Sequence, residues 1–233
     1  MARRGSGQSG FRLLFSRLTA AVLTLVSTYF GICIFLLVLY NFVYPPITGV
    51  QTQRLVEAVI LGEKVTYWYD PVSSAGISSQ LRHAVIAAED GRFLEHNGID
   101  WKAVEKAMED NRRRGEVWRG GSTITQQLVK NLFMTTHSSF VRKAFEIPLT
   151  YLAELILPKE RILDIYLNVI EWGRGVYGAD PAARYYYGVS ASRLSRYQAA
   201  ALAAVIPSPR RRSPQRMGWY TSIILQRMGQ LGY

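Results

Sequence analysis

Cysteine, histidine and acidic residues are all scarce in this chain of 233 residues. Its single cysteine, Cys33, excludes an intramolecular disulfide, and its three histidines do not cluster with cysteine as the ligands of a structural zinc site do. Asp and Glu number 17 against 28 Lys and Arg, which gives a net charge of +11. This charge favours a polyanionic partner, which could be nucleic acid, anionic lipid or a phosphorylated substrate.

Charged residues are also missing between residues 18 and 53, and Leu18 to Val43 is dominated by Leu, Val, Ile, Phe and Ala. About 20 such residues form a helix that can cross the roughly 30 Å hydrocarbon core of a bilayer. A cleaved signal peptide is the alternative, but its apolar region has only about 7 to 15 residues and ends in small residues. The stretch therefore predicts an uncleaved transmembrane helix, in which Cys33 is a small apolar filler.

Four arginines precede this helix, and an excess of Lys and Arg in a short tail marks the cytoplasmic side of a membrane. The four arginines are Arg3, Arg4, Arg12 and Arg17. We therefore expect a basic cytoplasmic tail at residues 1–17, a transmembrane anchor helix at 18–44 and a single domain at 45–233 on the opposite side.

The domain after the anchor has apolar residues at helical spacing along most of its length and few strand signals, apart from a short extended stretch at 65–69. Ser78 and Asp100 are placed to cap the first two helices, and Asp180 with Pro181 forms a typical cap and first-turn pair. The pattern predicts a mainly α fold. Helices are expected at 78–90, 101–114, 123–132, 141–157, 159–170, 182–186, 194–206 and 215–231.

The residues from Gly173 to Gly178 match the G-x-G-x-x-G pattern of dinucleotide-binding proteins. That pattern is meaningful only where it follows a strand and opens a helix, whereas here it follows the helical pattern of residues 165–170. We interpret the glycines as a turn in which backbone segments pack closely. The motifs Ser-x-x-Lys and Lys-Thr-Gly do not occur, which excludes the acyl-serine site of a transpeptidase or a β-lactamase.

Two adjacent carboxylates, Glu89 and Asp90, lie at the end of the first helix of the domain, where the helix dipole disfavours negative charge. Charge in an unfavourable position is typical of a functional site. A structural alternative is that Glu89 pairs with Arg92 or Arg82 on a solvated face.

A second informative stretch, Gly120 to Asn131, combines a glycine-led turn with hydroxyls, amides and Lys130 around a helix N-terminus. Such a terminus is suited to bind an oxyanion such as phosphate. An ordinary capped helix would explain Ser122 or Thr123, but not two glutamines beside a lysine.

A third stretch places Arg142 and Lys143 four and three residues before Glu146, and hence on one helix face with it. Alone, this is a common salt-bridge pattern. Together and in this order, the three stretches resemble the peptidoglycan glycosyltransferase family, glycosyltransferase family 51, in its monofunctional membrane-anchored form. The resemblance continues through residues 159–168, 173–178 and 182–188, and it covers nearly all of residues 75–208.

The resemblance implies an enzyme that polymerises lipid II. In this reaction the growing glycan chain, linked to undecaprenyl pyrophosphate, is transferred with inversion to the sugar 4-hydroxyl of lipid II. Glu89 is the implied general base, and Glu146 is the implied second catalytic carboxylate, which would orient the donor or bind a divalent cation such as Mg²⁺. The implied substrate-binding residues are Asp90, Ser122, Thr123, Thr125, Gln126, Gln127, Lys130, Asn131, Arg142 and Lys143.

The implied fold is a lysozyme-like domain with a small membrane-associated lobe. We expect this lobe at residues 132–140, because Phe133, Met134 and Phe140 have no obvious helical core face. Phe93 is expected in the core. The run from Arg210 to Arg212 could meet anionic headgroups or form a solvated basic patch.

The implied location is the bacterial inner membrane, with the N-terminus cytoplasmic and the catalytic domain periplasmic. The implied partners are lipid II, the undecaprenyl-pyrophosphate glycan chain, the lipid bilayer and other cell-wall synthesis proteins, and nucleic acid is not among them. One departure from many relatives is Gln198, which replaces a glutamate and puts an ion pair there in doubt.

Two other functions fit part of the sequence. A lysozyme-like enzyme that cleaves glycan would share the fold, but it never meets a pyrophosphate leaving group and would not need the cluster of Lys130, Arg142 and Lys143. A non-catalytic membrane scaffold for cell-wall enzymes would not need Glu89 and Glu146.

Overall fold

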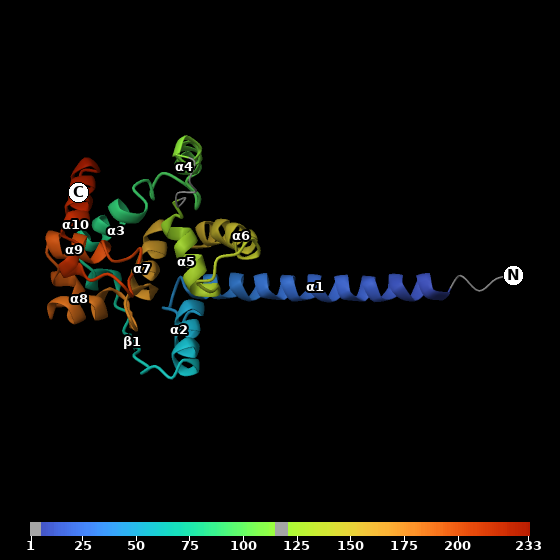
Figure 1. The fold of residues 1–233 in the computed structure, drawn as a ribbon. Helices are drawn as coiled ribbons and strands as arrows, with labels where there is room; N and C mark the ends of the chain where they lie inside the picture. The colour runs from blue at the N-terminus through green and yellow to red at the C-terminus, as the bar shows by residue number, and fades with distance from the viewer. Residues whose placement is uncertain (1–5, 115–120) are drawn as a thin grey trace.

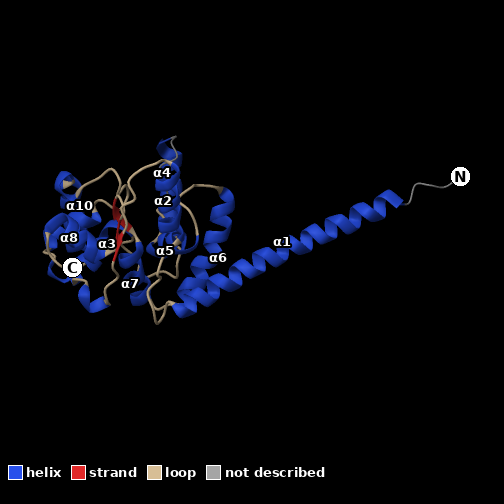
Figure 2. Cartoon of the chain, turned by 90° about the horizontal axis from the view of Figure 1, so that it is seen from below, coloured by secondary structure: helices blue, strands red, loops and turns tan. Residues whose placement is uncertain are grey.

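A computed structural model describes residues 6–114 and 121–233, so Arg3, Arg4 and Gly120 lie outside the described residues. A long helix, α1 (Ser6–Leu39), projects from a group of shorter helices (Figures 1 and 2). The other helices are α2 (Gly49–Ile60), α3 (Ser79–Glu89), α4 (Trp101–Arg114), α5 (Ile124–Phe133), α6 (Phe140–Ile156), α7 (Lys159–Val169), α8 (Ala179–Tyr187), α9 (Arg196–Ala203) and α10 (Gly218–Gln230). Short 3-10 turns lie at η1 (Ser74–Gly76), η2 (Ala191–Arg193) and η3 (Pro214–Arg216). The strands are β1 (Trp68–Tyr69), β2 (Glu171–Gly173) and β3 (Val176–Tyr177).

The mainly helical class predicted from the sequence is confirmed, and Arg12–Leu39 of α1 is long and apolar enough to cross a membrane. The last part of α1 nevertheless belongs to the folded domain. Phe30 stacks on Phe145 of α6 with 5.7 Å between the ring centroids, and Cys33 and Leu37 are buried in the core. Cys33 is therefore an apolar filler of the interface between α1 and the domain.

Arg161 of α7 fixes the segment that leaves α1. Its Nε donates to the carbonyl of Tyr40 at 2.7 Å, and its Nη2 donates to the carbonyl of Val43 at 2.8 Å. The remaining nitrogen, Nη1, pairs with Asp164 at 2.9 Å. The Arg161 guanidinium also lies 4.4 Å from the centre of the Tyr44 ring. One side chain thus joins α1, the linker after it and α7.

The centre of the domain is α7, in which every residue from Ile162 to Val169 is buried. Helix α5 packs against α7, α6 and α2, whereas α3 packs against α9 and α10 at the end of the molecule farther from α1 (Figure 1). The end of α3 therefore meets the beginning of α5 beside the buried face of α7.

A three-stranded sheet in the order β1-β3-β2 crosses this core. Trp68 of β1 pairs in parallel with Val176 of β3, and β2 and β3 form a hairpin around Gly175. Gly175 has a φ of +73°, and a Cβ there would lie 2.1 Å from the carbonyl oxygen of Thr66. The interpretation of these glycines as a turn with close backbone packing is confirmed, although the two hairpin strands themselves have no counterpart in the prediction.

Two of the three predicted helix caps are confirmed. Ser78 Oγ accepts a hydrogen bond from the Leu81 N–H at 3.2 Å, and Asp100 Oδ1 accepts one from the Ala103 N–H at 2.9 Å. The cap predicted at Asp180 is wrong, because α8 already begins at Ala179. Its carboxylate instead accepts from the Ala191 N–H at 2.8 Å and from Arg184 Nε at 2.6 Å.

The departure at Gln198 also has a structural role. Its side-chain oxygen accepts from the Ser195 N–H at 2.9 Å, and Ser195 Oγ accepts from the Gln198 N–H at 3.3 Å. Gln198 therefore completes a capping box at the start of α9, which requires no ion pair.

The segment from 132 to 140 differs from expectation in two of its three apolar residues. Met134 is buried, and Phe133 packs against the core while its carbonyl accepts from the Tyr29 hydroxyl at 3.3 Å. Of these three residues only Phe140 is exposed, with an exposed fraction of 96%. The premise that all three residues lack a core contact is therefore wrong.

Candidate active site

Glu89 ends α3 and faces α5. Gln127 Nε2 donates to Glu89 Oε2 at 2.7 Å. The two arginines that the solvated-face alternative assigns to Glu89 have other partners, because Arg92 pairs with Asp100 and Arg82 pairs with Asp164 at 3.5 Å. That alternative is therefore wrong.

Several groups act on the ionisation of Glu89. Burial raises the pKa of its carboxyl group above the ordinary glutamate value, and the neighbouring charge of Asp90 acts in the same direction. The hydrogen bond from Gln127 and the positive charges of Lys130 and Arg212 oppose this increase. The balance leaves a carboxylate that is both ionisable and more basic than one in water, as a general base requires.

Asp90 has a different environment from Glu89. Its carboxylate contacts His96 Nε2 at 2.9 and 3.1 Å, and Oδ2 accepts from the Ile124 N–H at 3.0 Å. Ile124 is the first residue of α5, so Asp90 satisfies a free amide at a helix N-terminus. Both oxygens of the Asp90 carboxylate therefore have partners within the protein, and these contacts join α3 to α5.

The start of α5 is a capping box. Thr123 Oγ1 accepts from the Gln126 N–H at 3.2 Å, and Gln126 Oε1 accepts from the Thr123 N–H at 3.1 Å. The Thr123 hydroxyl also donates to the Gly98 carbonyl at 2.5 Å. Thr125 is buried and donates to Glu154 at 2.5 Å. The side chains of Thr123, Thr125 and Gln126 thus have partners inside the protein.

The next turn of α5 lines a cavity, which we call the cleft. Asn131 Nδ2 donates to the Gln127 carbonyl at 2.8 Å, and the carbonyl of Ser122 lies 3.4 Å from Gln127 Nε2. Lys130 is half-buried, and it lines a cavity of about 210 Å³ together with Gln127 and Asn131. Among the residues that the structure describes, no hydrogen bond or ion pair to the Lys130 ammonium group is found.

The charges of both candidate catalytic carboxylates, Glu89 and Glu146, act on the Lys130 ammonium group. Burial lowers the pKa of Lys130, and attraction to Glu146 and Glu89 opposes this decrease. Repulsion by Arg142 and Lys143 adds to the decrease. A cation in this environment, with no partner among residues 6–114 and 121–233, is suited to bind a phosphate oxygen.

Glu146 is buried on α6 between the two cations that precede it. Arg142 Nη1 contacts Glu146 Oε2 at 2.8 Å, and Lys143 Nζ contacts Oε1 at 2.5 Å. The expected shared face is therefore observed, and each carboxylate oxygen already faces a cation.

Two residues of the site were not among the sequence candidates. Tyr166 of α7 is fully buried and donates its hydroxyl hydrogen to Gln127 Oε1 at 2.8 Å. Arg212 donates to the Ala204 carbonyl at 3.1 Å, and its charge acts on Glu89. Phe93 lies in the core as predicted, with Lys159 Nζ 4.4 Å above its ring.

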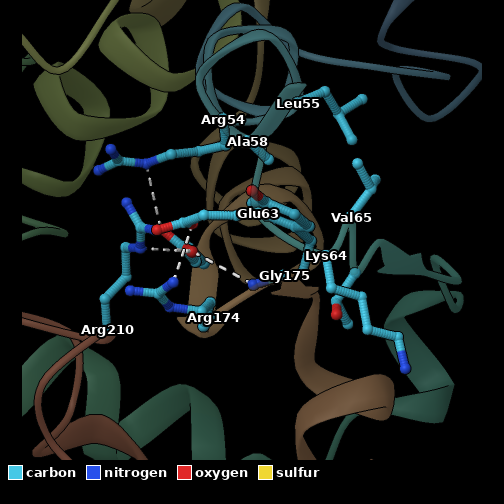
Figure 3. Close-up of a pocket in the computed structure, with 12 residues that line it drawn as sticks. Arg54, Leu55, Ala58, Glu63, Lys64, Val65, Arg174, Gly175 and Arg210 are labelled. Atoms are coloured by element: carbon cyan, nitrogen blue, oxygen red, sulfur yellow. Dashed lines mark hydrogen bonds and ion pairs between the residues drawn. The ribbon is translucent and has the colours of Figure 1, made fainter. Parts of the chain in front are cut away.

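A second charged cluster borders the cleft where α2, β2 and the loop after α9 meet. In Figure 3 the guanidinium groups of Arg54, Arg174 and Arg210 converge on the carboxylates between them. Arg54 Nε lies 3.5 Å from the buried Glu171, and Arg174 pairs with Glu63 at 2.9 Å. Arg210 of the basic run belongs to this cluster and lies 3.9 Å from Glu57, Glu63 and Glu171, and contact of the run with anionic headgroups remains a prediction.

Comparison with known proteins shows the family of the chain. The Transglycosylase family matches residues 56–229, and the biosynthetic peptidoglycan transglycosylase of Pseudomonas putida is 44% identical over 223 residues, which cover 94% of this chain and 92% of the relative. The chain belongs to this family. The proteins of the same name from Herminiimonas arsenicoxydans and Bordetella pertussis are 54% and 47% identical, over 66% and 75% of this chain and 68% and 74% of the relatives. The chain is a peptidoglycan glycosyltransferase, and its substrate class is the lipid-linked peptidoglycan precursor.

Proposed function

We propose that this glycosyltransferase extends glycan strands by inverting transfer of the undecaprenyl-pyrophosphate-linked chain to the 4-hydroxyl of lipid II, with Glu89 as the general base. The observation that supports this role is the position of Glu89, held by Gln127 at 2.7 Å at the end of α3 beside the unpaired Lys130. Glu89 takes the proton of the acceptor hydroxyl as the hydroxyl oxygen attacks the anomeric carbon. The bond from that carbon to the pyrophosphate oxygen breaks on the opposite face.

The leaving pyrophosphate requires fixed positive charge. Lys130 is free to contact a phosphate oxygen, and Arg142 and Lys143 can add charge from the first turns of α6. Glu146 holds these two side chains, at 2.8 and 2.5 Å, so we propose that it positions the cations. The direct substrate roles of Asp90, Ser122, Thr123, Thr125, Gln126 and Asn131 remain predictions.

The divalent cation that the resemblance implies also remains a prediction. Glu146 does not fit an ion as it is arranged, because Arg142 and Lys143 face its two oxygens. Asp90, His96 and Asp100 lie close enough together to hold a metal ion, but the guanidinium of Arg92 pairs with Asp100. We therefore derive no catalytic step through a metal.

The glycan-cleaving alternative requires a protonated carboxylic acid at the leaving oxygen. Glu146 is not placed to act as that acid, because Arg142 and Lys143 contact its two carboxylate oxygens at 2.8 and 2.5 Å. The cations near it instead fit a leaving group that is already charged. The names of the relatives, which all describe biosynthetic enzymes, also favour synthesis.

For the location, we propose that α1 spans the inner membrane with its N-terminus cytoplasmic and the catalytic domain periplasmic, as the arginines before the helix predict. We also propose that α6 lies beside α1 at the periplasmic surface of the inner membrane. Phe140, Val141 and Leu155 on α6 have exposed fractions of 96, 69 and 82%, and α6 packs directly on α1. Contacts with other cell-wall synthesis proteins remain a prediction.

The test is polymerisation of labelled lipid II by the detergent-solubilised full chain, with Glu89→Gln and the exposed-site control Glu105→Gln. We expect lysozyme-sensitive polymer from the wild type and the control, and a rate about 10²- to 10⁴-fold lower from Glu89→Gln. Full activity of Glu89→Gln would contradict the assignment of the base. Absence of polymer from a folded wild type would favour the scaffold alternative.

A further inference from the structure

Both the nitrogen and the oxygen of the Gln127 side-chain amide have hydrogen-bond partners within the protein. Its Nε2 donates to Glu89 Oε2 at 2.7 Å and to the Ser122 carbonyl at 3.4 Å. Its Oε1 accepts the hydroxyl hydrogen of Tyr166 at 2.8 Å. An amide nitrogen has two hydrogens, so no donor remains for a substrate.

Only one orientation of this amide satisfies its three neighbours. If the amide turned by 180°, Oε1 would face two acceptors, the Glu89 carboxylate and the Ser122 carbonyl. The Tyr166 hydroxyl hydrogen would also lose its acceptor, and no second acceptor for it is found among the described residues. Tyr166 is fully buried, so loss of that partner would leave a buried hydroxyl hydrogen unpaired, which would be costly.

We infer that Tyr166 is a positioning residue of the reaction, because its hydroxyl holds the Gln127 amide so that an N–H group faces the carboxylate of Glu89. This inference rests on the proposed role of Glu89 as the base. Tyr166 does not contact the carboxylate in any hydrogen bond of the structure and acts through Gln127. Tyr166 belongs to the buried part of α7, Ile162 to Val169.

The orientation of the amide affects how readily Glu89 ionises. An N–H group that donates to the carboxylate stabilises its charged form, whereas a carbonyl oxygen in the same place destabilises it. The other charged or titratable groups that act on Glu89 are Lys130 from α5, Arg212 from the loop after α9 and Asp90 beside it. The Tyr166 hydroxyl also faces Glu89 and Asp90, whose charges raise its pKa, so a Gln127→Ala background is needed to separate a direct effect from one that acts through Gln127.

The decisive variant is Tyr166→Phe, which removes one oxygen and keeps the buried ring. Its matched control is Tyr186→Phe, which removes a partly buried hydroxyl. That hydroxyl donates to the Trp172 carbonyl at 3.0 Å and does not contact Gln127. We expect Tyr166→Phe to lower kcat about three- to tenfold with little change in KM, as loss of one neutral hydrogen bond would. The acid limb of the rate profile should move to higher pH, so that part of the activity returns when the pH is raised.

A second readout does not depend on catalysis. In full-length protein with ¹³C-labelled glutamate side chains, the Glu89 carboxyl signal, assigned with Glu89→Gln, should titrate at higher pH in Tyr166→Phe than in the wild type or in Tyr186→Phe. In a Gln127→Ala background, Tyr166→Phe should have no further effect on this titration. An unchanged Glu89 titration in Tyr166→Phe, an equal shift in Tyr186→Phe, or additive effects of the two changes would overturn the inference. Failure of the proposed base would instead appear as an active Glu89→Gln enzyme, whatever the titration shows.

Discussion

Asp90 Oδ2 accepts a hydrogen bond from the backbone N–H of Ile124 at 3.0 Å, and this bond joins the end of α3 to the first residue of α5. The two helices provide Glu89 on one side and Gln127 and Lys130 on the other. The same carboxylate contacts His96 at 2.9 Å. Asp90 therefore keeps the base at a fixed distance from the residues that act on it.

The first prediction concerns this link. Asp90→Ala removes both acceptor oxygens and leaves the Ile124 N–H at the start of α5 without its partner, so we expect a loss of about 1 to 2 kcal/mol in the free energy of unfolding. Denaturant unfolding in detergent measures this change. Asp70→Ala is the matched control, because Asp70 is exposed and makes no side-chain hydrogen bond that the structure describes. Equal stability of the two variants would contradict the prediction.

The second prediction concerns pH. The base must be ionised to act, and burial raises the pKa of Glu89, so the acid limb of kcat/KM should have its midpoint above the ordinary glutamate value of about 4.3. Activity should therefore be lost, as the pH falls, earlier than for an exposed glutamate. Initial rates across this range, at constant ionic strength, give the midpoint. A midpoint at or below the ordinary value would show that Glu89 is not the group that limits the rate.

The third prediction concerns the leaving group. Lys130→Gln removes the unpaired cation of the cleft, and we expect kcat to fall about 10²- to 10³-fold, as for loss of one group that stabilises transition-state charge. The same change should move the acid limb to still higher pH, because the charge of Lys130 lowers the pKa of Glu89. Lys64→Gln, at an exposed position, should match the wild type. A loss confined to KM would indicate that Lys130 binds the ground state and the transition state equally.

The fourth prediction compares two glycines with positive φ. Gly175 (φ +73°) lies against the Thr66 backbone, whereas Gly188 (φ +69°) has open space around it. Alanine at either position has the cost of a left-handed backbone, about 1 to 2 kcal/mol, and Gly175→Ala has an additional overpacking cost of about 1 to 3 kcal/mol. Thermal unfolding of the two variants separates these costs. Equal melting temperatures would mean that the hairpin can move away from Thr66.

The fifth prediction concerns the junction after α1. Arg161→Lys cannot maintain the forked contacts with the carbonyls of Tyr40 and Val43 and with Asp164. We expect faster cleavage of the linker at residues 40–48 by added protease and a loss of about 1 to 3 kcal/mol in stability. Arg193→Lys, at an exposed site, is the control. Unchanged cleavage would show that packing of α1 alone holds the linker.

Local patterns predicted the parts of this fold that local chemistry determines. The caps at Ser78 and Asp100 and the shared face of Arg142, Lys143 and Glu146 follow from spacing along one helix. Helix α2 has no counterpart in the prediction, although Thr48 and Gln51 form a capping box that the sequence contains. A search for that pattern would have found the helix.

The remaining features depend on contacts between distant segments. Strand β1 pairs with β3 across more than a hundred residues, and two-residue strands have no period to detect. Asp180 has the local sequence of a cap, but its partner is the Ala191 amide. Tyr166 lies in the part of α7, Ile162 to Val169, that is buried on every side, so the sequence does not distinguish the hydroxyl that reaches the active site.

The packing of Phe30, Cys33 and Leu37 into the domain gives α1 a mechanical property. Because the last turns of the helix are part of the core and Arg161 holds the segment that follows, the end of α1 and the domain form one packed body. If α1 spans the membrane as we propose, this packing sets the height of the catalytic residues above the lipid surface. A substrate that is itself anchored in the lipid would then meet the enzyme at a matching height.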